Sequence, residues 1–199
     1  MKDAYFVSKP LDPEAVLHAN IKYGGRSYSW QTAPGVFQKR GLDQGTKLLL
    51  DCLEGENQGP FLDLGCGHGP LGLLHLARCP ENQLVQSDVN QSALELTQRN
   101  AKTLQLKTFV LWQRGAGAIQ ANSMRCVMTN PPIRTGNENL FEMFEESFDC
   151  LMPGGNFYFV ARAKQGVRTL SKRAAEIFSS SPEKLGRAKG FEVFRLKKT

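Results

Sequence analysis

The chain has 199 residues, of which 41% are hydrophobic and 22% charged, and this usage excludes a disordered or fibrous protein and predicts one globular domain. The polar N-terminus and the lack of any run near the roughly 20 apolar residues of a membrane span predict a cytoplasmic protein without membrane association. Lysine and arginine exceed aspartate and glutamate by 25 to 19, and the net charge of +6 favours a polyanionic partner such as nucleic acid.

The first 40 residues are predicted to form a small N-terminal extension. Residues 21–30 have the pattern of a β-hairpin with Gly24-Gly25 at its turn, and residues 32–38 follow as a loop. Residues 43–53 then begin the main domain as a helix with a polar cap and a leucine face. We therefore expect a boundary between residues 1–40 and 41–199.

From residue 61 onward, predicted strands and helices alternate. Strands are expected at 61–64, 83–88, 108–112, 125–129 and 156–160, and helices at 70–77, 90–104, 138–151 and 166–178. Residues 184–189 and 191–196 flank Gly190 as a closing antiparallel pair. This alternation predicts a doubly wound α/β fold, in which a mainly parallel sheet is covered by helices on both faces.

A glycine-rich turn follows the first strand of this alternation. Gly65, Gly67 and Gly69 let the backbone turn tightly and approach a ligand closely. The spacing differs from the Gly-x-Gly-x-x-Gly of a pyrophosphate loop, and Asp63 in front of the turn would repel a phosphate. The turn therefore suits a ligand with a cationic group, although a structural turn is the alternative.

Two further polar features follow predicted strands. Asp88 stands about where a βαβ nucleotide site has the acid that binds a ribose diol, although such an acid can also serve only the next helix. Asn130-Pro131-Pro132 offers a side-chain amide and carbonyl oxygens without competing N–H groups. Two such acceptors suit a planar exocyclic amine, whereas the alternative is a strand-ending turn.

Together, Asp63 to Gly69, Asp88 and Asn130-Pro-Pro-Ile-Arg134 resemble the small-domain family of class I S-adenosylmethionine (SAM) methyltransferases. So do residues 32–37, 41–46 and 189–195. The resemblance implies a Rossmann-like, seven-stranded sheet with a reversed last strand, residues 41–199 as the methyltransferase domain, and SAM as methyl donor. It also implies transfer to guanine N2 of ribosomal RNA, with RNA or the small ribosomal subunit as partner. Adenine N6, a glutamine amide, or a non-catalytic SAM- or RNA-binding module are the alternatives.

The resemblance assigns site residues by position. The expected catalytic residues are Asn130, Pro131 and Pro132. The expected cofactor-binding residues are Asp63, Gly65, Cys66, Gly67, Gly69, Asp88, Ala116 and Asn130. The expected substrate-binding residues are Phe37, Ile133, Arg134, Lys164 and Arg168.

This chain departs from the family pattern at two places. Residues 113–117 carry no acid, although family members often have one there that contacts adenine, so backbone groups near Ala116 are expected to recognise adenine. Ile133 stands where an aromatic residue often stacks on the target base, so Phe37 or Trp30 is expected to stack instead.

No metal site is predicted from the sequence. The five cysteines are Cys52, Cys66, Cys79, Cys126 and Cys150. Their odd number and wide spacing indicate reduced thiols, and His68 and His75 lack partners at ligand spacing. Lys164, Arg168 and Lys172 form a basic stripe that either contacts phosphates or is simply solvated.

Overall fold

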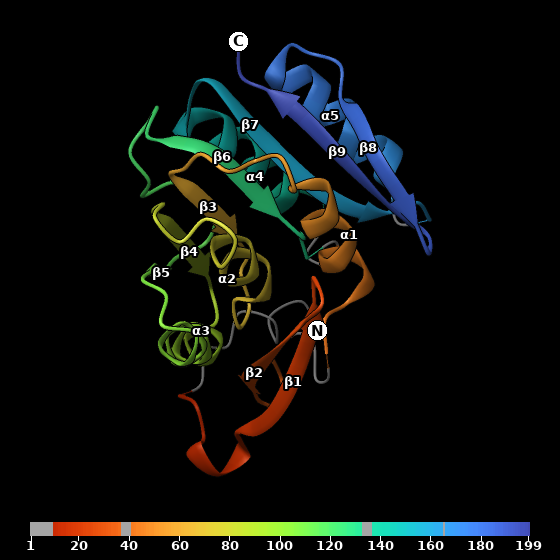
Figure 1. Ribbon diagram of the computed structural model, residues 1–199. Coiled ribbons are helices and arrows are strands. Elements are labelled where there is room, and N and C mark those ends of the chain that lie inside the picture. The colour runs from red at the N-terminus through yellow and green to blue at the C-terminus, as the bar shows by residue number, and fades with distance from the viewer. Residues whose placement is uncertain (1–9, 37–40, 133–136, 165) are drawn as a thin grey trace.

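A seven-stranded sheet forms the centre of the computed structural model, which describes residues 10–36, 41–132, 137–164 and 166–199 (Figure 1). Its strand order is β5-β4-β3-β6-β7-β9-β8. The strands are β3 (Phe61–Leu64), β4 (Leu84–Asp88), β5 (Phe109–Trp112), β6 (Met124–Thr129), β7 (Leu151–Arg162), β8 (Glu183–Ala188) and β9 (Phe191–Lys197). β9 runs antiparallel to both of its neighbours, β7 and β8, and the other neighbouring pairs are parallel, so the predicted mainly parallel sheet with a reversed last strand is confirmed.

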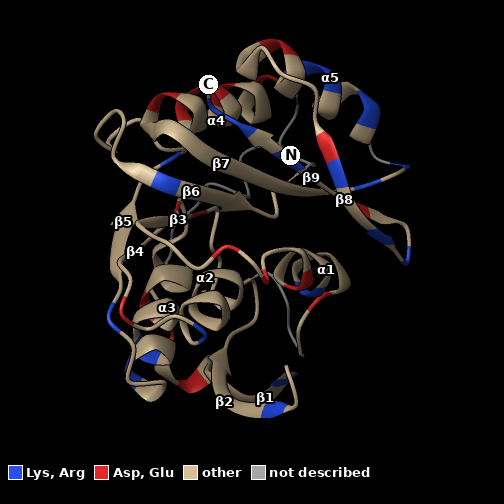
Figure 2. Cartoon of the chain, turned by 45° about the horizontal axis from the view of Figure 1, so that its top comes forward, with Lys and Arg blue, Asp and Glu red and all other residues tan. Residues whose placement is uncertain are grey.

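Helices cover both faces of the sheet, as Figure 2 shows. The helices are α1 (Gln44–Cys52), α2 (Pro70–Leu76), α3 (Gln91–Thr103), α4 (Asn137–Cys150) and α5 (Val167–Phe178). Alternate strand residues point to opposite faces, so Phe61 packs in one core with α1 and α2, while Leu62 packs in a second core with α4 and α5. The sheet is therefore buried on both sides, as a parallel sheet requires.

The hairpin is longer than predicted and is attached to the main domain. Strands β1 (Leu17–Tyr23) and β2 (Arg26–Thr32) follow a short 3-10 helix, Pro13–Ala15. Ile21 and Trp30 point into the first core, and each is 1% exposed. The hairpin therefore shares a core with α1 and α2, and a domain boundary at residue 40 stays a prediction.

The start of β7 differs from the sequence prediction. The pattern Pro153-Gly-Gly155 indicated a break before a strand at 156–160, but β7 begins at Leu151, directly after α4. Leu151 pairs with Met124, and the register of the two strands shifts between Met124 and Cys126. The shift gives the Pro-Gly-Gly segment room as an irregular part of the strand.

Other described features concern thiols, metals and membranes. All five cysteines are free, and all except Cys52 are buried. Within the described ranges, no cluster of three or more histidine, cysteine or acidic side chains could hold a metal ion. No helix in this part of the chain has both the length and the apolar character needed to cross a membrane.

Candidate cofactor and amine site

The glycine-rich turn joins β3 to α2 at the carboxyl end of the sheet. The N–H groups of Gly65 and Cys66 donate to the carbonyl of Ser87 at 2.9 and 3.0 Å, which fixes the turn to β4. Gly65 and Gly67 have φ values of 72° and 58°, a region that favours glycine. A Cβ added to either residue would meet no protein atom within 4 Å. The turn therefore faces open space, as a ligand cradle requires.

Asp88 joins this turn to the start of α3. Its Oδ2 accepts the N–H of Gly67 at 2.8 Å, and its Oδ1 accepts the N–H of Asn90 at 2.9 Å. Burial raises the pKa of the Asp88 carboxyl, while its bonds to backbone N–H groups oppose the shift. The sequence prediction that the turn and Asp88 lie together is confirmed.

Asp63 lies farther inside than its ligand-facing interpretation suggests. Asp63 is 1% exposed. Its Oδ2 accepts the N–H of Gly72 at 2.8 Å and the Nε2–H of Gln86 at 3.2 Å. Burial raises its pKa to about 7. In these contacts Asp63 fixes α2 against β4, and a direct role toward a ligand stays a prediction.

Asn130 follows β6 and is held from α1. Its Nδ2 donates to Asp43 Oδ2 at 3.1 Å and to Thr46 Oγ1 at 3.0 Å. One residue earlier, the hydroxyl of Thr129 donates to the carbonyl of Leu64 at 2.7 Å, so the ends of β6 and β3 are joined. Asn130 is half-buried and lies on the same edge as the glycine turn and Asp88.

Ala116 lies in the segment after β5, where the expected acid is missing. Its N–H donates to Glu146 Oε2 of α4 at 2.6 Å, and burial raises the pKa of Glu146. A Cβ added to Gly115, whose φ is 66°, would lie 1.7 Å from Glu146 Oε2. A carboxylate from α4 thus occupies the space of a side chain at position 115, which sequence analysis missed.

Cys66 and Gly69 serve the turn itself. Burial raises the pKa of the Cys66 thiol well above its usual range, so the thiol stays protonated. At Gly69 an added Cβ would approach Leu73 and Thr97 to 3.0 and 3.1 Å, so close packing against α2 and α3 requires glycine there.

The predicted substrate residues are only partly described. Phe37, Ile133 and Arg134 lie outside the described residues. The alternative that Trp30 stacks on a base is wrong, because its ring is 1% exposed and belongs to the core.

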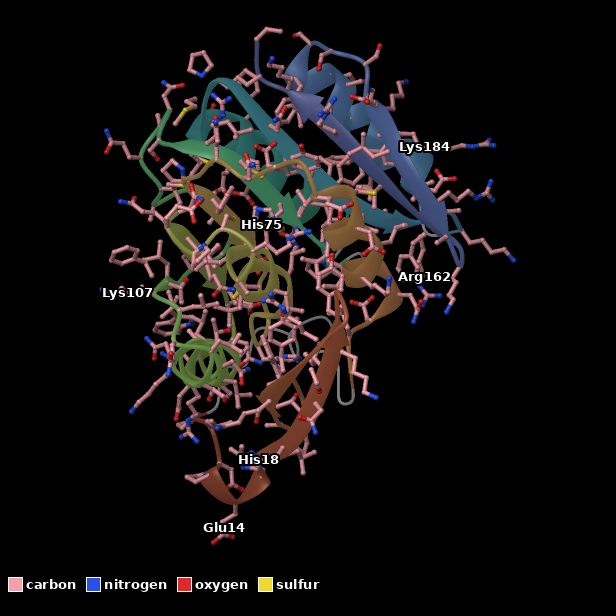
Figure 3. The ribbon with its side chains drawn as sticks, viewed as in Figure 1. Glu14, His18, His75, Lys107, Arg162 and Lys184 are labelled. Atoms are coloured by element: carbon pink, nitrogen blue, oxygen red, sulfur yellow. The ribbon has the colours of Figure 1, made fainter. Side chains whose placement is uncertain are left out.

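Basic side chains gather around α5 and the β8–β9 edge, where Figure 2 shows several blue segments and Figure 3 labels Lys184. A cavity of about 410 Å³ lies between these elements and is lined by Arg168, Lys184, Arg187 and Glu192, among others. The buried carboxylate of Glu192 lies 3.0 Å from Lys184 Nζ and 3.6 Å from Arg187 Nε. We call exposed Lys164, Arg168, Lys184 and Arg187 the basic surface.

The residues that hold the site were weakly signalled in the sequence. Asp43 and Thr46 were recognisable as the start of a helix, but nothing in the sequence links them to Asn130, 87 and 84 residues away. Glu146 is one of five acids in α4, and no spacing distinguishes it from the others.

Sequence comparison relates the chain to known methyltransferases. Residues 27–195 match the family model described as methyltransferase small domain. The uncharacterised protein YbxB of Bacillus subtilis is 28% identical over 201 residues, and the match covers both chains completely. Ribosomal RNA small subunit methyltransferase C of Pseudomonas entomophila is 30% identical over 166 residues, which cover 81% of this chain and 48% of that protein.

A solved structure has the same fold. The T. thermophilus 16S rRNA N2 methyltransferase, in complex with AdoMet and guanosine, gives a TM-score of 0.83 at 23% identity. The match covers 96% of this chain and 52% of that one, so the chain spans about half the length of the ribosomal enzymes described here. Because the family model matches most of its length, the chain belongs to the methyltransferase small domain family.

Proposed function

We propose that this protein transfers a methyl group from SAM to an exocyclic amine of a nucleobase, namely guanine N2 of ribosomal RNA. One observation carries the proposal: the glycine turn, Asp88 and Asn130 come together at the carboxyl ends of the neighbouring strands β4, β3 and β6. Ligands of open α/β sheets bind at this edge. Membership of a methyltransferase family supports methyl transfer as the reaction.

The residues of the turn fit SAM. The open space before Gly65 and Gly67 leaves room for the amino acid end of the cofactor close to the backbone. The N–H groups of Gly67 and Asn90 bind different oxygens of Asp88, and a carboxylate offers about four lone pairs, which leaves acceptor capacity for a ribose hydroxyl. The bound cofactor supplies an electrophilic methyl group on a positively charged sulfur.

Asn130 and Pro131 orient the nucleophile. The Asn130 side-chain oxygen accepts one hydrogen of the target amine, and the Pro131 carbonyl accepts the other, which aims the nitrogen lone pair at the methyl group. Pro132 fixes the backbone next to this carbonyl and brings no N–H donor of its own to the site. The reaction then needs no strong base, because the amine loses its proton during or after transfer, and positioning supplies most of the rate.

An RNA substrate is supported by the basic surface and by the relatives. Lys164 lies between β7 and α5, and Arg168 lies in the first turn of α5. The carboxyl end of β7 belongs to the same edge as the cofactor site. Cationic side chains here can contact phosphates beside a target base. The ribosomal RNA methyltransferases among the relatives favour guanine N2.

Two other substrates and one other function fit fewer observations. Adenine N6 and a glutamine amide also present planar NH2 groups to two acceptors. A binding module without catalysis would keep the glycine turn and would not need Asn130. Incubating the protein with labelled SAM and separate RNA, DNA and protein fractions, followed by mass analysis, tests all of these. Label only in guanine N2 of RNA supports the proposal, and label in DNA or protein alone contradicts it.

Variants separate binding from transfer. Gly67→Leu fills the cradle, so calorimetry should show loss of SAM binding. Asn130→Ala should retain SAM but lower turnover about 10²- to 10³-fold, because one preorganised polar group is lost. Asn130→Asp should also bind SAM and lose rate, because its charge favours the cationic donor over the transition state. Wild-type turnover in both Asn130 variants would refute the proposed mechanism.

A further inference from the structure

Asn130 is held by a small hydrogen-bond triangle that belongs to the start of α1. Its Nδ2 donates to Asp43 Oδ2 at 3.1 Å and to Thr46 Oγ1 at 3.0 Å, and the Thr46 hydroxyl donates to Asp43 Oδ2. From this triangle we infer that Asp43 is a positioning residue, which fixes the Asn130 amide so that only its Oδ1 is offered to the amine substrate. The inference rests on the proposed function of Asn130.

The direction of each bond follows from the chemistry of Asp43. An ionised carboxylate only accepts hydrogen bonds, so the Thr46 hydroxyl must donate to it. The oxygen of Thr46 is then left to accept from Asn130. Both acceptors lie within hydrogen-bond distance of Nδ2, so the NH2 end of the amide faces Asp43 and Thr46, and the side chain addresses a substrate through Oδ1.

The opposite orientation of the amide is unfavourable. Rotating the amide by half a turn would bring Oδ1 against Asp43 Oδ2 and the lone pairs of Thr46. The carboxylate would repel the amide oxygen, and the bond to a charged acceptor, which is stronger than a neutral one, would be lost. A freely turning asparagine would present its NH2 to the substrate part of the time, and two amines cannot hydrogen-bond productively to each other.

Asp43 can carry this role because it is itself fixed. It caps α1: Oδ1 accepts the N–H of Gly45 at 2.8 Å, and Oδ2 accepts the N–H of Thr46 at 3.3 Å. The cap packs directly on the sheet, since a Cβ added to Gly45 would lie 2.9 Å from the ring of Phe191. Leu49 of α1 is fully buried in the same core. The position of α1 on the sheet is thereby transmitted to the amide.

Asp43→Asn tests the inference with little effect on the helix, because asparagine caps helices about as well as aspartate. The new amide can present either oxygen or NH2 to Asn130, so the orientation is no longer enforced. With transcribed, unmodified 16S ribosomal RNA as substrate, we expect kcat to fall roughly 10- to 100-fold, as is typical when a partner that orients a site residue is lost. The KM for SAM should change less than about twofold, since the variant leaves the cradle intact.

A double-mutant cycle distinguishes positioning from general damage. If Asp43 acts through Asn130, then Asp43→Asn should lower kcat no further in a protein that already carries Asn130→Ala. Asp51→Asn is the matched control, because Asp51 is an exposed acid of the same helix, paired with Lys47 at 2.8 Å. This control should keep the wild-type rate. Full additivity of Asp43→Asn and Asn130→Ala would overturn the inference.

A measurement without RNA separates this inference from the proposed function. In the nitrogen-proton NMR spectrum, the Asn130 side-chain NH2 signals are those that Asn130→Ala removes. We expect these protons to exchange with water at least about tenfold faster in Asp43→Asn and in Thr46→Val, which keeps the shape of threonine but removes the acceptor. Unchanged exchange in both variants overturns the positioning role. If exchange rises as expected while Asn130→Ala keeps full turnover, the positioning stands and the proposed mechanism fails.

Discussion

The indole N–H of Trp30 donates to Nδ1 of His68 over 2.7 Å, which joins strand β2 of the hairpin to the glycine-rich turn. Asn100 of α3 strengthens the same junction, because its side chain donates to the carbonyls of Gln31 and His68, each at 3.0 Å, and accepts the N–H of Gln31 at 2.7 Å. The N-terminal hairpin therefore holds the glycine-rich turn in place, directly through Trp30 and indirectly through Asn100. This gives the extension a physical connection to the candidate cofactor site.

Trp30→Phe should destabilise the fold by about 1 to 3 kcal/mol, because it keeps an aromatic ring but leaves a buried acceptor on His68 without its donor. Trp112→Phe is the matched control. The Trp112 indole also donates a hydrogen bond, to the carbonyl of Val89 at 2.9 Å, but this residue is 63% exposed. Losing the Trp112 hydrogen bond should lower the free energy of unfolding by less than about 0.5 kcal/mol. Denaturant unfolding measures this free energy for both variants. Equal losses would contradict the expectation that the buried Trp30 bond matters more.

Asp63 should make stability fall as pH rises from about 4 to about 7. Burial raises its folded-state pKa from 3.8 to about 7, so the folded protein holds the proton more tightly than the unfolded chain. The stability that this group contributes is complete below its pKa in the unfolded chain and is lost as pH rises through its pKa in the folded protein. The free energy of unfolding changes by at most about 1.4 kcal/mol per pH unit from this group.

Asp63→Asn keeps the shape of the side chain and removes the proton. Because other groups titrate in the same range, the informative quantity is the difference in unfolding free energy between wild type and variant at each pH. Between pH 4 and 7 we expect the free energy of unfolding of the variant to rise relative to that of wild type. A constant difference would show that Asp63 does not titrate in this range.

Hydrophobic periodicity was sufficient to predict most of the sheet. The helix at 90–104 was found because Asn90 caps it and its apolar residues recur at helical spacing, and the structure has α3 at Gln91–Thr103 with that cap. The early start of β7 was missed because Pro-Gly-Gly usually ends an element, whereas pairing of Leu151 with Met124 is a property of the tertiary structure. Local sequence carries no signal for such a pairing.

The candidate site was predictable where a residue follows a strand directly. Asp88 and Asn130 could be placed on one edge by counting strands, because parallel strands end together. The contacts that hold Asn130 and Ala116 were not predictable, since they come from Asp43 at the cap of α1 and from Glu146 in α4, both far away in sequence. Asp63 shows the opposite error: its position in the motif suggested a ligand contact, while its described bonds are to Gly72 and Gln86.

Neutralising the basic surface should weaken RNA binding in a salt-dependent way. If Lys164 and Arg168 contact phosphates, changing both to alanine should reduce the slope of log affinity against log salt by roughly one to two units. Changing Lys102 and Lys107 to alanine removes the same charge elsewhere; Figure 3 shows Lys107 on the side of the molecule away from Lys184. Equal changes of slope in both pairs would indicate that net charge alone matters.

The acid at position 146 and the glycine at position 115 should behave as a compensating pair. Gly115→Asp puts an acid into residues 113–117, the segment where the family resemblance leads us to expect one. Its Cβ would lie 1.7 Å from Glu146 Oε2, so the change should be strongly destabilising alone. Glu146→Ala should cost about 1 kcal/mol through the lost bond to the Ala116 N–H. Together they should cost about 1 to 3 kcal/mol less than the sum of the two changes, because the alanine frees the space that the new side chain needs.

Some strain should remain in the double variant, because residue 115 has a φ of 66°, although aspartate tolerates this region better than most residues. Denaturant unfolding of the four proteins measures the coupling, and Glu142→Ala provides a control, since Glu142 pairs instead with Arg114 at 2.7 Å and should not rescue Gly115→Asp. SAM affinity in the double variant then tests the chemistry. If an acid in this space contacts adenine, moving it from α4 to the loop should preserve binding, whereas Glu146→Ala alone should weaken it. Additive stability changes would show that Glu146 moves away without cost. Unchanged SAM affinity in Glu146→Ala would show that its carboxylate does not replace the missing acid.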